Sequence, residues 1–111
     1  MSVTITELEA QITNEKEVIR KANVLRKLFS NPDFKEIILD GYCTKEAIRL
    51  TKNLRQPEFE TAVKQENLFN KLGAISELQE YFRVIEIQAQ MSEKNIISTE
   101  DEISNVMAEE E

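Results

Sequence analysis

The side chains best placed for chemistry in this sequence are four regularly spaced basic residues. Four basic residues are separated by four, three and three positions: Lys45, Arg49, Lys52 and Arg55. On a helix this spacing places them along one face. Such a basic stripe can bind an acidic protein partner, nucleic-acid phosphate or the acidic C-terminal residues of this chain, and it is also typical of an ordinary solvated face. It is the best candidate contact surface in the sequence.

Other residue types needed for catalysis are scarce. The sequence has no histidine, which is the usual base near neutral pH and the commonest nitrogen ligand of metals. Carboxylates are abundant, but on amphipathic helices they usually form the wet face. Glycine occurs only at positions 41 and 73, so the sequence lacks the glycine-rich loop that binds phosphate groups. The sequence therefore predicts no catalytic residue, no cofactor and no metal, and the chain is not expected to be an enzyme.

Cys43 is the only cysteine, so no intramolecular disulfide can form and a reducing compartment is the default. Beside Tyr42 and before Thr44, it would lie at an expected helix start, where the helix dipole lowers a thiol pKa. A half-buried structural cysteine is the favoured interpretation. No role is assigned to it.

Charge is unevenly distributed along the 111 residues. Six of the 21 acidic residues and none of the 14 basic ones follow Ile97, which leaves fifteen acidic residues against all the basic ones before it. This imbalance argues against nonspecific nucleic-acid binding. We expect one helical domain over residues 1–97 and an acidic tail over 98–111. The tail would be either disordered or a short helix capped at Ser98, and the basic stripe is a possible docking site for it.

The composition predicts an all-α fold, because 41% of residues are hydrophobic, 32% are charged, and only two glycines and two prolines are present. Thr4 and Glu7 have the spacing of a capping box, so a first helix should run from about residue 5 to Ser30. Its expected apolar stripe comprises Leu8, Ile12, Val18, Ile19, Ala22, Leu25, Leu28 and Phe29.

Prolines and glycines divide the middle of the chain. Pro32 should start a second, short helix, which Gly41 should end by adopting a left-handed conformation. Thr44 is the expected N-cap of a third helix that ends before Pro57. The expected architecture is a short multi-helix bundle with one long C-terminal helix and the acidic tail.

Residues 58 to about 95 should form that long helix, because apolar residues recur there at intervals of three and four: Phe59, Ala62, Val63, Phe69, Leu72, Ile75, Leu78, Phe82, Ile85 and Ala89. At 1.5 Å per residue it would measure roughly 55 Å, too long for the preceding helices to cover. Either Gly73 breaks it, or its far end packs on another subunit. Continuity is favoured, since one interior glycine costs only about 1 kcal/mol. Leu78, Phe82 and Ile85 are therefore expected to contact a partner subunit, and the five phenylalanines are expected in the core or in such an interface.

The N-terminal residues lack the basic and apolar regions of a signal peptide, and no apolar run is long enough to cross a bilayer. A cytoplasmic protein without membrane contact is expected.

The segments NPDFKEIILDGYCTKEAIRL at 31–50 and ISELQEYFRVIE at 75–86 resemble small helical proteins from the structural gene clusters of tailed bacteriophages. The resemblance implies a minor virion or head-assembly protein, found in the virion or the host cytoplasm, that oligomerises or binds capsid, portal or related subunits. It carries no catalytic motif. The alternative is a phage-encoded helical module that inhibits a host protein or sequesters a small ligand.

Overall fold

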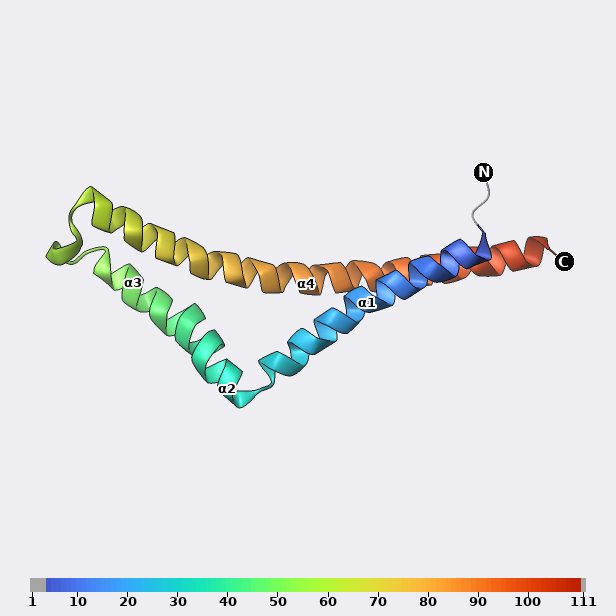
Figure 1. Cartoon of the computed structure of the whole chain (residues 1–111), viewed down its shortest axis with the longest axis horizontal. Coiled ribbons are helices and arrows are strands. Elements are labelled where there is room, and N and C mark those ends of the chain that lie inside the picture. Colours follow the sequence, from blue (N-terminus) through green and yellow to red (C-terminus); the bar gives the residue numbers. More distant parts are fainter. Residues whose placement is uncertain (1–3, 111) are drawn as a thin grey trace. The chain divides into compact units, whose positions relative to one another are not determined.

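The computed structural model describes residues 4–110, and within them the fold is all-α (Figure 1). The elements are α1 (Ile5–Phe29), α2 (Pro32–Phe34), the π-helix η1 (Lys35–Glu46), α3 (Ala47–Asn53), the short 3₁₀-helix η2 (Pro57–Phe59) and α4 (Ala62–Glu109). The predicted fold class is confirmed, including the long C-terminal helix. The predicted bundle remains a prediction.

The first helix begins where the capping box predicts. The backbone N–H of Glu7 donates to the hydroxyl of Thr4 at 3.1 Å, and the N–H of Thr4 donates back to the Glu7 carboxylate at 3.2 Å. This reciprocal pair satisfies two N–H groups that a helix start otherwise leaves unbonded. At the next helix start the side chain of Asn31 accepts from Asp33 and Phe34 at 2.9 and 3.1 Å. Pro32 therefore starts a helix, as predicted.

The predicted end of that helix at Gly41 is wrong, and so is the predicted N-cap at Thr44. Gly41 lies inside η1, and no described residue has a positive φ. The hydroxyl of Thr44 donates to the carbonyl of Leu39, five residues earlier, at 2.9 Å. Helical backbone therefore continues from Pro32 to Asn53.

A glycine is needed in η1 because the backbone comes close to itself. A Cβ atom added at Gly41 would lie 3.0 Å from the carbonyl oxygen of Glu36. Since a π-helix closes its turns between residues five apart, side chains five apart can share a face. Ile38 and Cys43 have this separation, and both belong to the same apolar cluster.

The long helix starts later and ends later than predicted. Pro57 belongs to η2, and α4 begins at Ala62, where the side chain of Thr61 accepts from the N–H of Lys64 at 3.3 Å. The helix continues through Gly73, as favoured from the sequence, and then through Ile97 to Glu109. The separate helix expected to start at Ser98 is not present, and the predicted boundary at Ile97 does not coincide with a helix end.

Two compact units make up the chain: unit 1 comprises residues 1–25 and 84–111, and unit 2 comprises residues 26–83. In unit 1, α1 and the C-terminal part of α4 run antiparallel, and the Asn95 amide donates to the Glu15 carboxylate at 3.3 Å (Figure 1). Ala22 lies seven residues after Glu15, and Ala89 lies six residues before Asn95. Because the antiparallel helices rise equally per residue, the two alanines lie at nearly the same level. Both alanines are fully buried.

Unit 2 has a core of larger side chains. Cys43, Leu50, Leu68 and Ile75 form its buried centre, with Leu72 and Leu78 among the half-buried residues packed around it. Phe82 packs against Phe29 and Phe34, with ring centroids 5.2 and 6.2 Å away. These contacts place helical residues of 32–53 against the first part of α4.

Candidate protein interaction surfaces

The basic stripe predicted from the sequence lies on exposed positions. Lys45 is at the end of η1, Arg49 and Lys52 are on α3, and Arg55 follows the last turn of α3. Leu50, on the same helix, is 1% exposed and faces the core. The basic stripe therefore lies on the outer side of this helical segment, and the apolar side of the same segment packs into the unit 2 core.

One of the four cations is already paired. Arg49 donates from Nε to the carboxylate of Glu46 at 3.1 Å, and its Nη2 atom contacts the other carboxylate oxygen. This hydrogen bond lowers the pKa of Glu46 below its ordinary value and raises the pKa of Arg49. An incoming carboxylate would therefore compete with Glu46 for Arg49. Among the residues that the structure describes, Lys45, Lys52 and Arg55 form no salt bridge.

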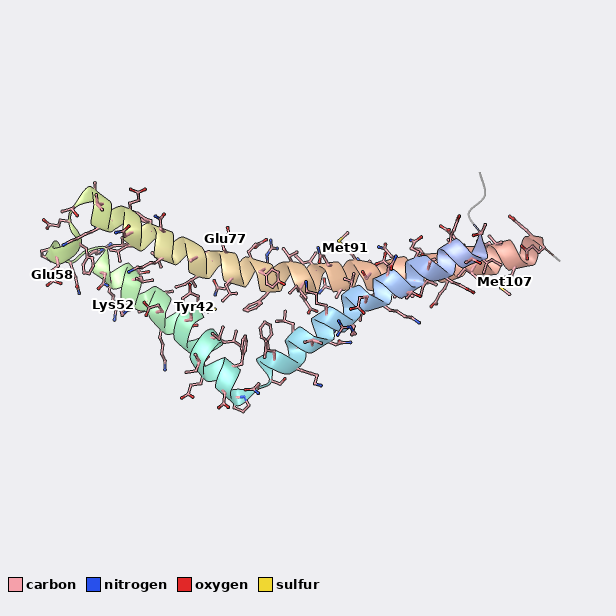
Figure 2. The ribbon with its side chains drawn as sticks, in the orientation of Figure 1. Tyr42, Lys52, Glu58, Glu77, Met91 and Met107 are labelled. Carbon is pink, nitrogen blue, oxygen red and sulfur yellow. The ribbon has the colours of Figure 1, made fainter. Side chains whose placement is uncertain are left out.

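Two shallow depressions adjoin this stripe. One has a volume of about 460 Å³ and is lined by Gly41, Tyr42, Lys45, Glu46 and Arg49. The other, of about 350 Å³, is lined by Ala47, Ile48, Thr51 and Lys52. Figure 2 shows Tyr42 and Lys52 on this helical segment. Ile48 is 51% exposed, so the stripe combines cations with an accessible apolar side chain.

The three apolar residues predicted to contact a partner have contacts within the chain. Leu78 packs around the unit 2 core, Phe82 lies among aromatic rings, and Ile85 is buried in unit 1. Ile85 therefore has little surface left for a partner, whereas Leu78 and Phe82 are half-buried, and the partner contacts of the three residues remain a prediction. The core position predicted for Leu28 is wrong, since Leu28 is 41% exposed. Phe69 is 59% exposed, so of the two environments predicted for the phenylalanines only the interface remains for it.

Sequence reasoning missed the true register of α4. Leu68, omitted from the predicted stripe, is 2% exposed and replaces its neighbour Phe69 in the core. From Ile75 to Val106 the covered positions other than Glu86 alternate by three and four: 75, 78, 82, 85, 89, 92, 96, 99, 103 and 106. This is the heptad spacing of helix-to-helix packing. Extending it back by seven from Ile75 reaches Leu68, a signal that was available in the sequence.

A second surface lies on the outer side of α4 in unit 1. Val84, Ile87 and Met91 are 36%, 38% and 58% exposed, and they follow one another at intervals of three and four. This spacing places them along one face. The neighbouring Ile85 and Ala89 point into the unit. We call Val84, Ile87 and Met91 the outer apolar face, and Met91 is marked in Figure 2.

The third surface is the acidic end of α4. Five acidic residues lie on exposed positions: Glu100, Asp101, Glu102, Glu109 and Glu110. The last turn of α4 has no basic residue. The C-terminal end of a helix already carries partial negative charge, so these carboxylates lie where cations would be more favourable. Met107, 55% exposed, lies among them.

No group of three or more potential ligands that could hold a metal ion occurs within residues 4–110. Cys43 is 8% exposed inside η1, not at a helix start, and burial raises the pKa of its thiol. The neutral thiol is a small apolar core group rather than a nucleophile. No helix among the described residues is long and apolar enough to span a bilayer.

Comparison with protein families, curated proteins and solved structures finds no match to this chain.

Proposed function

We propose that this chain is a non-enzymatic assembly protein that joins protein subunits by helix packing. The outer apolar face carries the proposal. Val84, Ile87 and Met91 lie in line on a helix whose opposite side is already covered, so they are accessible without disturbing the unit 1 core. Aligned apolar residues on a helix are a common way to bind a groove or another helix.

The partner class comes from the resemblance of residues 31–50 and 75–86 to small helical proteins of tailed phages. We propose capsid, portal or related virion subunits as partners. A neighbouring helix would cover the outer apolar face, and the charged surfaces would select its orientation. Such a protein needs no bound cofactor and no catalytic group.

The test is quantitative mass spectrometry of purified phage particles that carry either the natural chain or an Ile87→Lys/Met91→Lys variant. The natural chain should appear at a fixed copy number per particle, and the variant should fall by about tenfold or more, because two lysines would be buried at the contact.

The control is Gln88→Lys/Gln90→Lys, which adds the same charge in the same helical segment at exposed polar positions. It should retain the natural copy number. Absence of the natural chain from particles, or equal loss for both variants, would contradict the proposal. Absence from particles together with binding to a host protein would favour the inhibitor alternative.

A further inference from the structure

We infer that the acidic end of α4 docks on the basic stripe of a second copy of this chain, with the two helices antiparallel. The inference names one partner for the proposed assembly function and rests on it. It is carried by charge and spacing that match between two surfaces of the same sequence.

The match has three points. On the stripe, Lys45, Ile48 and Arg55 provide a cation, an apolar side chain and a second cation. At the acidic end, Glu110, which directly follows α4, provides an anion, and Met107 and Glu100 on α4 provide an apolar side chain and a second anion. Both sets have steps of three and seven residues, in opposite chain directions.

Antiparallel docking therefore brings the three pairs to similar levels, with Ile48 on α3, Lys45 at the end of η1 and Arg55 two residues after α3. Ile48 and Met107 are 51% and 55% exposed, so contact between them would remove two accessible apolar side chains from water. The four charged residues lie on exposed positions. Each exposed ion pair is weak alone, so the binding depends on several acting together around an apolar contact.

The two units that carry these surfaces also differ in net charge. Unit 1 contains twelve acidic and four basic residues, a net charge of −8, whereas unit 2 contains nine acidic and ten basic residues, a net charge of +1. The acidic end of α4 additionally has the negative end of the helix dipole. A cationic helix from another copy neutralises both.

A second copy is favoured because every copy of the chain carries both complementary surfaces, the acidic end of α4 and the basic stripe. Each copy would offer one acidic end and one basic stripe, so copies would add head to tail.

The experiment is sedimentation velocity of the purified full-length chain over a concentration series. Three variants are compared with the natural sequence: Glu100→Lys/Glu110→Lys, Lys45→Glu/Arg55→Glu, and the chain that carries all four changes. Circular dichroism confirms that each variant keeps its helix content. The control, Glu66→Lys/Glu93→Lys, changes net charge as much as the first variant at other exposed positions.

The natural chain and the control should associate with concentration. Each two-residue reversal should weaken association at least about tenfold, because it replaces attraction with repulsion at two points. The fourfold variant should recover association, and so should an equimolar mixture of the two reversed chains. Raising salt from about 0.1 M to about 1 M shortens the Debye length from roughly 10 to 3 Å and should weaken the natural assembly.

A monomeric natural chain, unchanged association in either reversed variant, or failure of the fourfold variant to recover would each overturn the inference. Docking within one chain would appear as concentration-independent behaviour and would also overturn it. Particle incorporation through the outer apolar face uses none of these charges, so it would survive such an outcome.

Discussion

Unit 1 and unit 2 both pair helices, but they use different side chains at the contact. The unit 1 seam buries four small residues, Ala22, Ala89, Ser92 and Thr99, beside the larger Leu8, Leu25 and Ile85, all at most 7% exposed. Unit 2 also buries leucine and isoleucine, together with a group of phenylalanine rings. Small residues allow close helix approach with little apolar area, whereas large ones bury more area per contact. Unit 2 should therefore gain additional hydrophobic stability from its phenylalanine rings, and the alanine positions of unit 1 should depend on close fit.

The largest expected effect is Leu50→Ala in unit 2. Leu50 is 1% exposed at the centre of the core, so its truncation should lower the free energy of unfolding by about 2–5 kcal/mol. Urea denaturation followed by circular dichroism measures the change. Ile48→Ala, on the exposed side of the same helix, is the control, and a similar loss there would contradict the core assignment.

A smaller loss is expected from Ala89→Leu in unit 1. Ala89 is fully buried opposite Ala22, so the larger side chain should push the helices apart and cost about 1–3 kcal/mol. Ala74→Leu, at an exposed position of the same helix, should be nearly neutral. If Ala89→Leu stabilised the protein, the seam would be loosely packed and the contrast between units would be wrong.

The two glycines provide a matched pair within unit 2. Gly73→Ala meets no atom within 4 Å and should stabilise α4 by up to about 1 kcal/mol through helix propensity. Gly41→Ala gains the same propensity but meets the Glu36 carbonyl at 3.0 Å. It should therefore be the less stable of the two by thermal denaturation. Equal stabilisation would show that η1 has no tight approach at this position.

The smallest effect concerns pH. Hydrogen bonds from Arg20, Arg49 and Arg83 lower the pKa values of Glu17, Glu46 and Glu80 below the ordinary value of a glutamate. A carboxyl group whose pKa is lower in the folded state stabilises the fold above its unfolded pKa, and this contribution disappears as pH falls through the folded value. As the pH falls below the ordinary pKa of glutamate, about 4.3, the helices should begin to lose a little stability. Arg49→Gln/Arg83→Gln should reduce this loss in unit 2, and an unchanged pH profile would contradict it.

Much of the fold follows from local sequence chemistry. The Thr4 and Glu7 capping box and the proline at position 32 act over three or four residues, so they could be read directly. The role of Gly41 could not be predicted in this way, because it depends on a π-turn in which the Glu36 carbonyl approaches Gly41. Leu68 and Phe69 are adjacent apolar residues, and only one of them can face the helix packed against α4. Which one does so is decided by tertiary packing, which the sequence pattern alone does not show.

The candidate surfaces also differ in how far the sequence alone could predict them. The basic stripe of Lys45, Arg49, Lys52 and Arg55 was found by spacing alone, although its Glu46 ion pair was not. The outer apolar face was missed because an apolar residue can be assigned to the exposed side only after the opposite side is known to be covered. Ile85 and Ile87 illustrate this, since they are two residues apart and are 5% and 38% exposed.

Oxidative footprinting of Met91 tests most directly whether the outer apolar face is a binding surface. Met91 is 58% exposed in the chain, so its thioether should oxidise readily in the free protein. In purified particles the same residue should be protected by about tenfold or more if a partner covers the face. Equal oxidation of Met91 in free protein and in particles that contain the chain would contradict the account.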